Sequence, residues 1–238
     1  MGLDIVSISL DIDPDQARPF IDKAVASATD GAPIVRALID TEHATTAALG
    51  FTNVPMALWV DETGTIVRPP ESASIERSSL ADMEISDDWP ERLANQLRVA
   101  QSIPSNADAY RGAILDWAEH GAECRFAMSP DDVLAAAEPR DADAAEAVAA
   151  FELGQALYQR AGGGADGIAA ARPWWQRAHD LDADNWTYKR QAWTLVTTPE
   201  GQPSDLMQGP NEVFTGNWLD DVVANGGGEA YVVAPKGI

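Results

Sequence analysis

The fold is decided by the stretch Val54-Pro-Met-Ala-Leu-Trp-Val-Asp-Glu-Thr-Gly-Thr-Ile-Val67. An apolar run covers Met56–Val60, and a second run from Thr65 to Arg68 follows the turn Asp61–Gly64, whose glycine permits a positive φ. This spacing predicts two antiparallel strands joined as a hairpin. Two prolines, Pro69 and Pro70, come next, and because proline has no N–H to donate, we expect the strand ladder to end there.

Two strand and helix units are expected before this hairpin. The apolar patterns and the helix start and stop signals place them in a definite order. They predict a buried strand over Asp4–Asp11, a helix over Pro14–Ala28, a short strand over Ile34–Ile39, and a helix capped by Asp40 or Thr41 that stops near Gly50.

The rest of the chain has helical periodicity followed by a loop-rich end. We expect helices over Pro90–Ile103, Ala107–His120, Pro130–Glu138, Asp143–Arg160, Ile168–Leu181 and Asn185–Val196. These patterns divide the chain into an α/β portion over residues 1–75, an all-α portion over residues 76–200 and a segment over residues 201–238 with a strand at 230–234.

The order of elements up to the hairpin resembles the second part of a thioredoxin-like redoxin domain. The residues that carry the resemblance are Ile5-Val-Ser-Ile-Ser-Leu-Asp11, Leu38-Ile-Asp40, Leu49-Gly-Phe-Thr-Asn-Val-Pro-Met56 and Leu58-Trp-Val-Asp-Glu-Thr-Gly-Thr-Ile-Val67. The resemblance implies a thioredoxin-like fold, a cis peptide bond between Val54 and Pro55, and a binding face at these two residues.

The first strands of that family, with the CxxC motif, would precede Met1. In the family the strand that leads into CxxC lies between the strands that match Ile5–Leu10 and Met56–Val60, so its absence would leave backbone groups unpaired at about 1–3 kcal/mol each. Three sources of a replacement strand stay open: a longer chain of which this is a fragment, the segment Ala230–Ala234, or a second chain in a homo-oligomer.

The helical portion resembles a tetratricopeptide repeat. Small residues would let two helices approach while large ones fill the space beside them. The pattern consists of Ala150-Phe-Glu-Leu-Gly154, Leu157, Ala171, Trp175, Ala178 and Leu181-Asp-Ala-Asp-Asn185. The run Ala161–Gly167 is expected to lengthen the turn between the helices. A single repeat cannot bury its own face, so we expect it to pack against its neighbours.

Charge restricts the partners. The chain carries 38 acidic and 16 basic residues, a formal net charge of −22, which repels nucleic acid and anionic membranes. Only three of the 16 basic residues are lysines, which suggests a bacterial protein from a GC-rich or salt-adapted source. No apolar run is long enough to span a membrane, and Met1–Leu10 lacks the basic start of a signal peptide, so a cytoplasmic location is expected unless the N-terminus is truncated.

The single cysteine, Cys124, excludes a disulfide within the chain and a CxxC redox pair. We therefore expect no dithiol oxidoreductase activity from this chain alone. No nucleotide, protease, hydrolase or calcium motif is present, and we predict neither a cofactor nor a metal site.

Two groups of residues are candidates for binding. Asp40 and His43 could form a carboxylate–histidine pair that takes a proton or holds a metal, although a surface histidine in a capped first turn is the more frequent arrangement. Trp175, Lys189 and Arg190 belong to an aromatic and basic group that could bind an acidic or C-terminal peptide, although such a stripe more often forms helix-packing core.

The sequence therefore predicts a redox-inactive binding or scaffold module for a protein or peptide partner. The alternative is a thiol-disulfide oxidoreductase or peroxide-reducing redoxin whose cysteines lie in a missing N-terminal segment. A third hypothesis is a non-redox enzyme that uses Asp40 and His43 on the face of Pro55.

Overall fold

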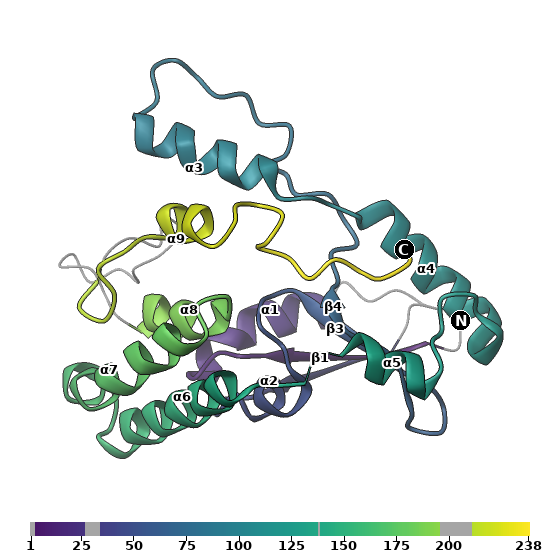
Figure 1. Cartoon of the computed structure of the whole chain (residues 1–238), viewed down its shortest axis with the longest axis horizontal. Coiled ribbons are helices and arrows are strands. Elements are labelled where there is room, and N and C mark those ends of the chain that lie inside the picture. Colours follow the sequence, from purple (N-terminus) through teal and green to yellow (C-terminus); the bar gives the residue numbers. More distant parts are fainter. Residues whose placement is uncertain (1–2, 27–33, 138, 196–210) are drawn as a thin grey trace.

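The computed structural model describes residues 3–26, 34–137, 139–195 and 211–238. The protein is a mixed α/β structure, with two small sheets in its N-terminal part and helices afterwards. Figure 1 shows α6, α7 and α8 packed together at one end, α4 and α5 at the other end, and the strands between them. The predicted order, an α/β portion followed by a helical portion, is confirmed at this level.

The first sheet is a parallel pair. Strand β1 (Asp4–Ser9) leads through α1 (Pro14–Ala26) into β2 (Ile34–Ile39), and the register runs from Asp4 opposite Ile34 to Ser9 opposite Ile39. Parallel neighbours need such a crossover, and here the helix supplies it. The predicted strand, helix and strand are present, with boundaries within a few residues, although the predicted helix end at Ala28 lies outside the described residues. The prediction that the first strand is buried is wrong, because β2 is its only neighbour among the described strands and Ile5 and Val6 are exposed.

The short helix α2 (Ala44–Leu49) ends at Gly50 as the sequence predicts, but it begins later than predicted, because His43 and not Asp40 or Thr41 is the N-cap residue. The Asp40 carboxylate accepts hydrogen bonds from the backbone N–H groups of Ala44 at 3.1 Å and Thr45 at 2.7 Å. At the other end, Gly50 adopts a left-handed conformation with φ 75° and donates to the carbonyl of Thr46. A polar cap and a C-terminal glycine therefore set both ends of the helix.

The second sheet is the predicted hairpin, formed by β3 (Met56–Val60) and β4 (Ile66–Ser72). The expectation that Pro69 and Pro70 end the ladder is wrong, because Ala57 pairs with Glu71 beyond them. Between the pairs Trp59–Arg68 and Ala57–Glu71, the two prolines lie opposite the single residue Leu58. Their missing N–H groups thus fall in a bulge, where no ladder bond is required.

The predicted helices are all present within the described residues. They are α3 (Glu91–Ser102), α4 (Ala107–His120), α5 (Pro130–Ala136), α6 (Ala142–Arg160), α7 (Gly164–Leu181) and α8 (Trp186–Leu195), with a short 3₁₀ turn at Gly121–Glu123. The prediction of a lengthened turn before α7 is wrong, because α7 begins four residues before Ile168. Gly167 lies inside this helix, in close contact with Tyr158. Helix α9 (Trp218–Ala224), capped by Asn217, was not predicted.

The helical hairpin of α6 and α7 packs around Trp175, which is fully buried. Gly154 lies so close to it that a Cβ atom there would be 2.7 Å from the indole Cδ1 and Nε1 atoms. Ala171 and Ala178 are also fully buried in this core. The predicted use of small residues at the helix contact is therefore what the structure has.

Gly154→Ala is expected to destabilise the protein through this contact, because overpacking a core costs about 1–3 kcal/mol. Gly112→Ala on α4 is the matched control, since a Cβ there meets no atom within 4 Å and alanine favours helix by about 1 kcal/mol. Urea unfolding of both variants separates the packing cost from helix propensity. Equal free energies of unfolding for the two variants would show that the contact with Trp175 is not tight.

The predicted strand at Ala230–Ala234 is wrong, because the C-terminal segment is irregular. Its Tyr231 ring packs edge-on against Trp186 and Trp218, and Val233 accepts one backbone hydrogen bond from Ser72 at the end of β4, at 2.9 Å. The segment is held by these contacts beside the hairpin and does not enter between β1 and β3. The boundaries at residues 75 and 200 stay predictions, and residues 196–210 lie outside the described part.

Candidate functional site

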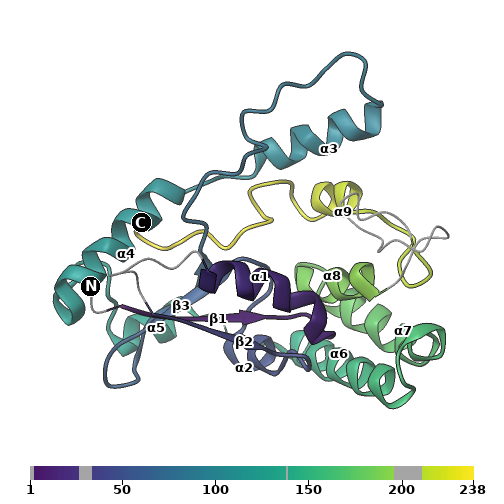
Figure 2. The ribbon, with the colours of Figure 1, turned by 180° about the vertical axis from the view of Figure 1, so that it is seen from behind.

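The two sheets are not joined to each other. Among the described residues, β1 pairs only with β2 and β3 pairs only with β4, so one edge of β1 and one edge of β3 lack a neighbouring strand. Figure 2 shows β1 and β3 running near each other below the C-terminal segment. An unpaired strand edge presents backbone N–H and C=O groups that can pair with another chain.

A groove of about 340 Å³ lies between these two strands. Alternate side chains of β1 line it, as expected because successive side chains of a strand point to opposite faces. Side chains of β3 and of the neighbouring loops and helices complete the lining. The main apolar lining residues are Val6, Ile8, Leu10, Val54, Met56, Leu58, Val60 and Trp117. Of the described residues that line this β1–β3 groove, only Asp4 is charged.

The cis peptide bond between Val54 and Pro55 is present, as predicted, at one end of the groove. Asn53 positions this turn: its side chain accepts from the N–H of Val54 and donates to the carbonyl of Tyr231, each at 2.8 Å. Arg190 lies behind Asn53 and donates to its Oδ1 at 3.3 Å. Of the predicted binding residues, Val54 therefore lines the groove and Arg190 supports the turn.

Several apolar side chains that line the groove are exposed. Val6 is 54% exposed and Val54 is 45% exposed, and Val60 is exposed as well. Clustered exposed apolar side chains of this kind mark interaction sites more often than single ones do. Sequence reasoning missed Val6, Ile8 and Leu58 as site residues, because an apolar strand reads as buried whether or not a neighbour covers it.

The predicted pair of Asp40 and His43 does not form. Burial raises the pKa of Asp40, but hydrogen bonds from Thr45, Ala44 and Glu42 outweigh it and leave that pKa below its usual value. His43 is 2% exposed, so the alternative of a surface histidine is also wrong. The structure separates the capping role of Asp40 from the buried role of His43.

His43 instead connects β1 to the helical portion. Its Nε2 atom lies 2.8 Å from the carbonyl of Leu10 and 2.7 Å from Oε1 of Gln191, and its φ of 57° is unusual for a residue other than glycine. Both neighbours are acceptors, so Nε2 carries a proton and donates. Burial lowers the pKa of His43, although these two hydrogen bonds act in the opposite direction.

Trp175 and Lys189 are buried side chains, so neither offers an open groove for a peptide. Trp175 is in the core of α6 and α7, and Lys189 is paired with Asp221 and lies 5.4 Å from the centre of the Phe214 ring. These two residues therefore match the alternative given by the sequence, a helix-packing core. Their role in binding a partner stays a prediction.

Cys124 is buried beside Trp59 and Tyr110. Burial and the hydrogen bond with Asp116 raise the pKa of its thiol, which is the opposite of what a reactive cysteine requires. Within the described ranges, no three His, Cys, Asp or Glu side chains come together as a metal site. The helices of the same ranges include none that is both long and apolar enough to cross a membrane.

Comparison of the chain with models of known families, with curated proteins and with solved structures finds no match. The assignment to a class therefore depends on the sequence patterns and on the geometry described above.

Proposed function

We propose that this chain is a non-catalytic binding module, built from a thioredoxin-like α/β portion and a tetratricopeptide-like helical portion, that takes up an extended peptide strand. The observation that carries the proposal is the β1–β3 groove, where two unpaired strand edges face one apolar channel next to Pro55. A strand in this position could pair with both edges, and each backbone hydrogen bond contributes about 0.5–1.5 kcal/mol net.

The lining indicates what kind of segment would bind. An extended peptide presents alternate side chains to one face, and valine, isoleucine or threonine side chains match the apolar channel. A second copy of this chain is a poor source of that segment, because each copy carries a net charge of −22 and the two would repel each other. The occupant we propose is therefore an apolar strand from a neutral or basic polypeptide.

A paired substitution on β1 tests the proposal. Val6→Lys places a charge in the groove, whereas Ile5→Lys places the same charge on the neighbouring residue, which does not line it. With a short peptide of alternating valine and threonine flanked by lysines as the probe, we expect Val6→Lys to weaken binding about tenfold or more, because the buried lysine loses solvation. Ile5→Lys should bind as the parent does in calorimetric titration.

Amide hydrogen exchange gives a second measurement, since pairing should protect the N–H groups of β1 and β3 on adding the peptide. If binding is saturable but unchanged by Val6→Lys, the peptide binds elsewhere and the proposal is contradicted. The absence of any binding would contradict it as well. Concentration-dependent self-association abolished by Val6→Lys would identify a second copy as the occupant and would overturn the choice of partner.

A further inference from the structure

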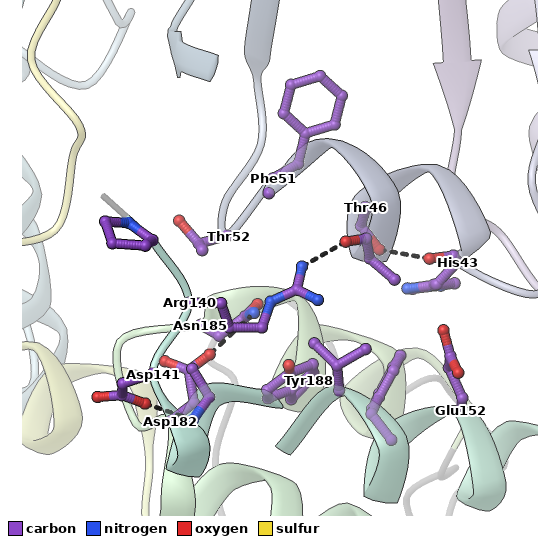
Figure 3. Close-up of a pocket in the computed structure, with 16 residues that line it drawn as sticks. His43, Thr46, Phe51, Thr52, Arg140, Asp141, Glu152, Asp182, Asn185 and Tyr188 are labelled. Atoms are coloured by element: carbon purple, nitrogen blue, oxygen red, sulfur yellow. Dashed lines mark hydrogen bonds between the residues drawn. The ribbon is translucent and has the colours of Figure 1, made fainter. Parts of the chain in front are cut away.

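A second cavity, of about 320 Å³, lies between α2 and the helices α6 and α8 (Figure 3). It shares Phe51 with the lining of the β1–β3 groove and is otherwise lined by different residues, and we call it the Arg140 pocket. Its apolar wall comes from Phe51, Val148 and Phe151. Its size is at the lower end of the range for small-molecule sites, which are mostly apolar with a few placed polar groups.

One cation of the pocket is available to a ligand. Arg140 is exposed, and its guanidinium donates to the backbone carbonyl of Ala47. Within the described part of the chain Arg140 forms no ion pair, although Asp182 lies near enough for the charge of Arg140 to act on its carboxylate. The nearby arginines of α7 differ, since Arg172 pairs with Glu212 and Arg177 pairs with Glu146, each at 2.7 Å.

One anion is available in the same way. Three carboxylates line the pocket, and none of them forms an ion pair in the described ranges. Glu152 is exposed and holds no hydrogen bond there either, whereas Asp141 and Asp182 each accept one. Asp141 caps α6 by accepting from the N–H of Ala144 at 2.8 Å, and Asp182 accepts from the Asn185 amide at 3.3 Å. Figure 3 shows Arg140 near the centre of the pocket and Glu152 on the side of His43.

The floor adds a buried polar atom without a partner. His43 and Tyr188 both line the pocket and are 2% and 3% exposed. His43 Nδ1 has no hydrogen-bond partner among the described residues, whereas the Tyr188 hydroxyl interacts with the side chain of Asn185. Both rings pack against Phe151, at 5.2 Å and 4.6 Å between ring centres. A buried polar atom left unpaired costs about 1–3 kcal/mol, so the position of His43 Nδ1 beside the cavity points to a binding role.

We propose that the Arg140 pocket binds a small zwitterion of the α-amino acid class. The ligand carboxylate would accept hydrogen bonds from the Arg140 guanidinium, the ammonium group would donate to Glu152, and the side chain would lie on Phe151. Charge-assisted hydrogen bonds of this kind are about twice as strong as neutral ones. Arg140, which forms no ion pair, and Glu152, which holds neither an ion pair nor a hydrogen bond among the described residues, match the two charges of such a ligand.

Calorimetric titration of the full chain tests the proposal with L-leucine and L-glutamine as probes. We expect saturable binding of at least one of them. The analogue that lacks the carboxylate is an alkylamine, and the analogue that lacks the ammonium group is an alkanoate. Each should bind about tenfold more weakly or worse, because each loses one charged hydrogen bond.

Variants separate this pocket from other binding surfaces. Arg140→Gln and Glu152→Gln should each reduce affinity about tenfold or more, whereas Arg177→Gln, which removes an exposed cation outside the pocket, should leave it unchanged. Both targets are exposed, and circular dichroism checks that the variants fold. No saturable binding of either probe, equal binding of the analogues, or binding insensitive to both variants would overturn the proposal. Val6→Lys serves as an independent marker of the β1–β3 groove and should not affect this titration.

Discussion

Glu71→Gln is expected to lower the free energy of unfolding by about 3–5 kcal/mol, because it removes one partner of a buried ion pair. The side chains of Arg68 and Glu71 are each 2% exposed, and two hydrogen bonds of 2.7 and 2.8 Å join them. Glutamine keeps the shape of the side chain but leaves the guanidinium charge buried without a counterion. That uncompensated charge is the source of the loss.

Arg68 also connects segments that are distant in sequence. Its guanidinium donates to the carbonyl of Phe126 at 2.8 Å and to the carbonyl of Lys236 at 2.7 Å. Glu71 holds the guanidinium in the orientation that makes both contacts. We therefore expect Glu71→Gln to loosen the C-terminal segment as well as to lower global stability.

Urea unfolding measures the effect, with Asp108→Asn as the matched control. Asp108 and Arg111 form an ion pair with the same spacing of three residues, but their side chains are 97% and 52% exposed. Exposed pairs of this kind contribute little to stability, because solvent and salt screen them. A loss for Glu71→Gln no greater than that for Asp108→Asn would show that the buried pair does not stabilise the fold.

The parts of the fold that the sequence predicts are those set by neighbouring residues. Helix α4 has the predicted ends, Ala107 and His120, because its apolar spacing and the following Gly121 are local signals. The cap of α2 by Asp40 and its end at Gly50 are local in the same sense. These elements follow from patterns within about one helical turn of each boundary.

The site depends on contacts between distant parts of the chain, and sequence patterns did not predict it. His43 is buried, and its Nε2 atom lies 2.7 Å from Oε1 of Gln191, a residue 148 positions away. The N–H of Trp186 likewise donates to the carbonyl of Thr52 at 2.7 Å, which brings α8 against the loop before Pro55. The cis peptide bond between Val54 and Pro55 was predicted correctly because a sequence motif marks that turn, whereas the binding role of these two residues stays a prediction.

Acid is expected to destabilise the protein through His179, by about 3 kcal/mol between pH 7 and pH 4. The pKa of His179 is lowered from 6.5 to about 4, first by burial and then by the charge of Lys189, although Asp221 and Asp180 act in the opposite direction. Its ring packs edge-on against Phe214, and its Nδ1 atom is buried without a partner among the described residues.

The sign follows from proton binding. The unfolded chain takes up a proton at this histidine near pH 6.5, whereas the folded protein does so only near pH 4. The stability is therefore fully present above pH 6.5 and is lost as the pH falls through the folded pKa. Protonation of carboxylates reduces the repulsion from the net charge of −22 and acts in the opposite direction, so the wild-type curve alone does not isolate His179.

His179→Gln isolates this contribution, because glutamine does not titrate and every other group is shared with the parent. We expect the free energy of unfolding in urea to fall by about 3 kcal/mol more for the parent than for the variant between pH 7 and pH 4. His43, whose pKa burial also lowers, contributes to both proteins and cancels in the difference. If parent and variant show the same pH dependence, His179 is not held neutral by its surroundings, and the loss in acid must come from other groups.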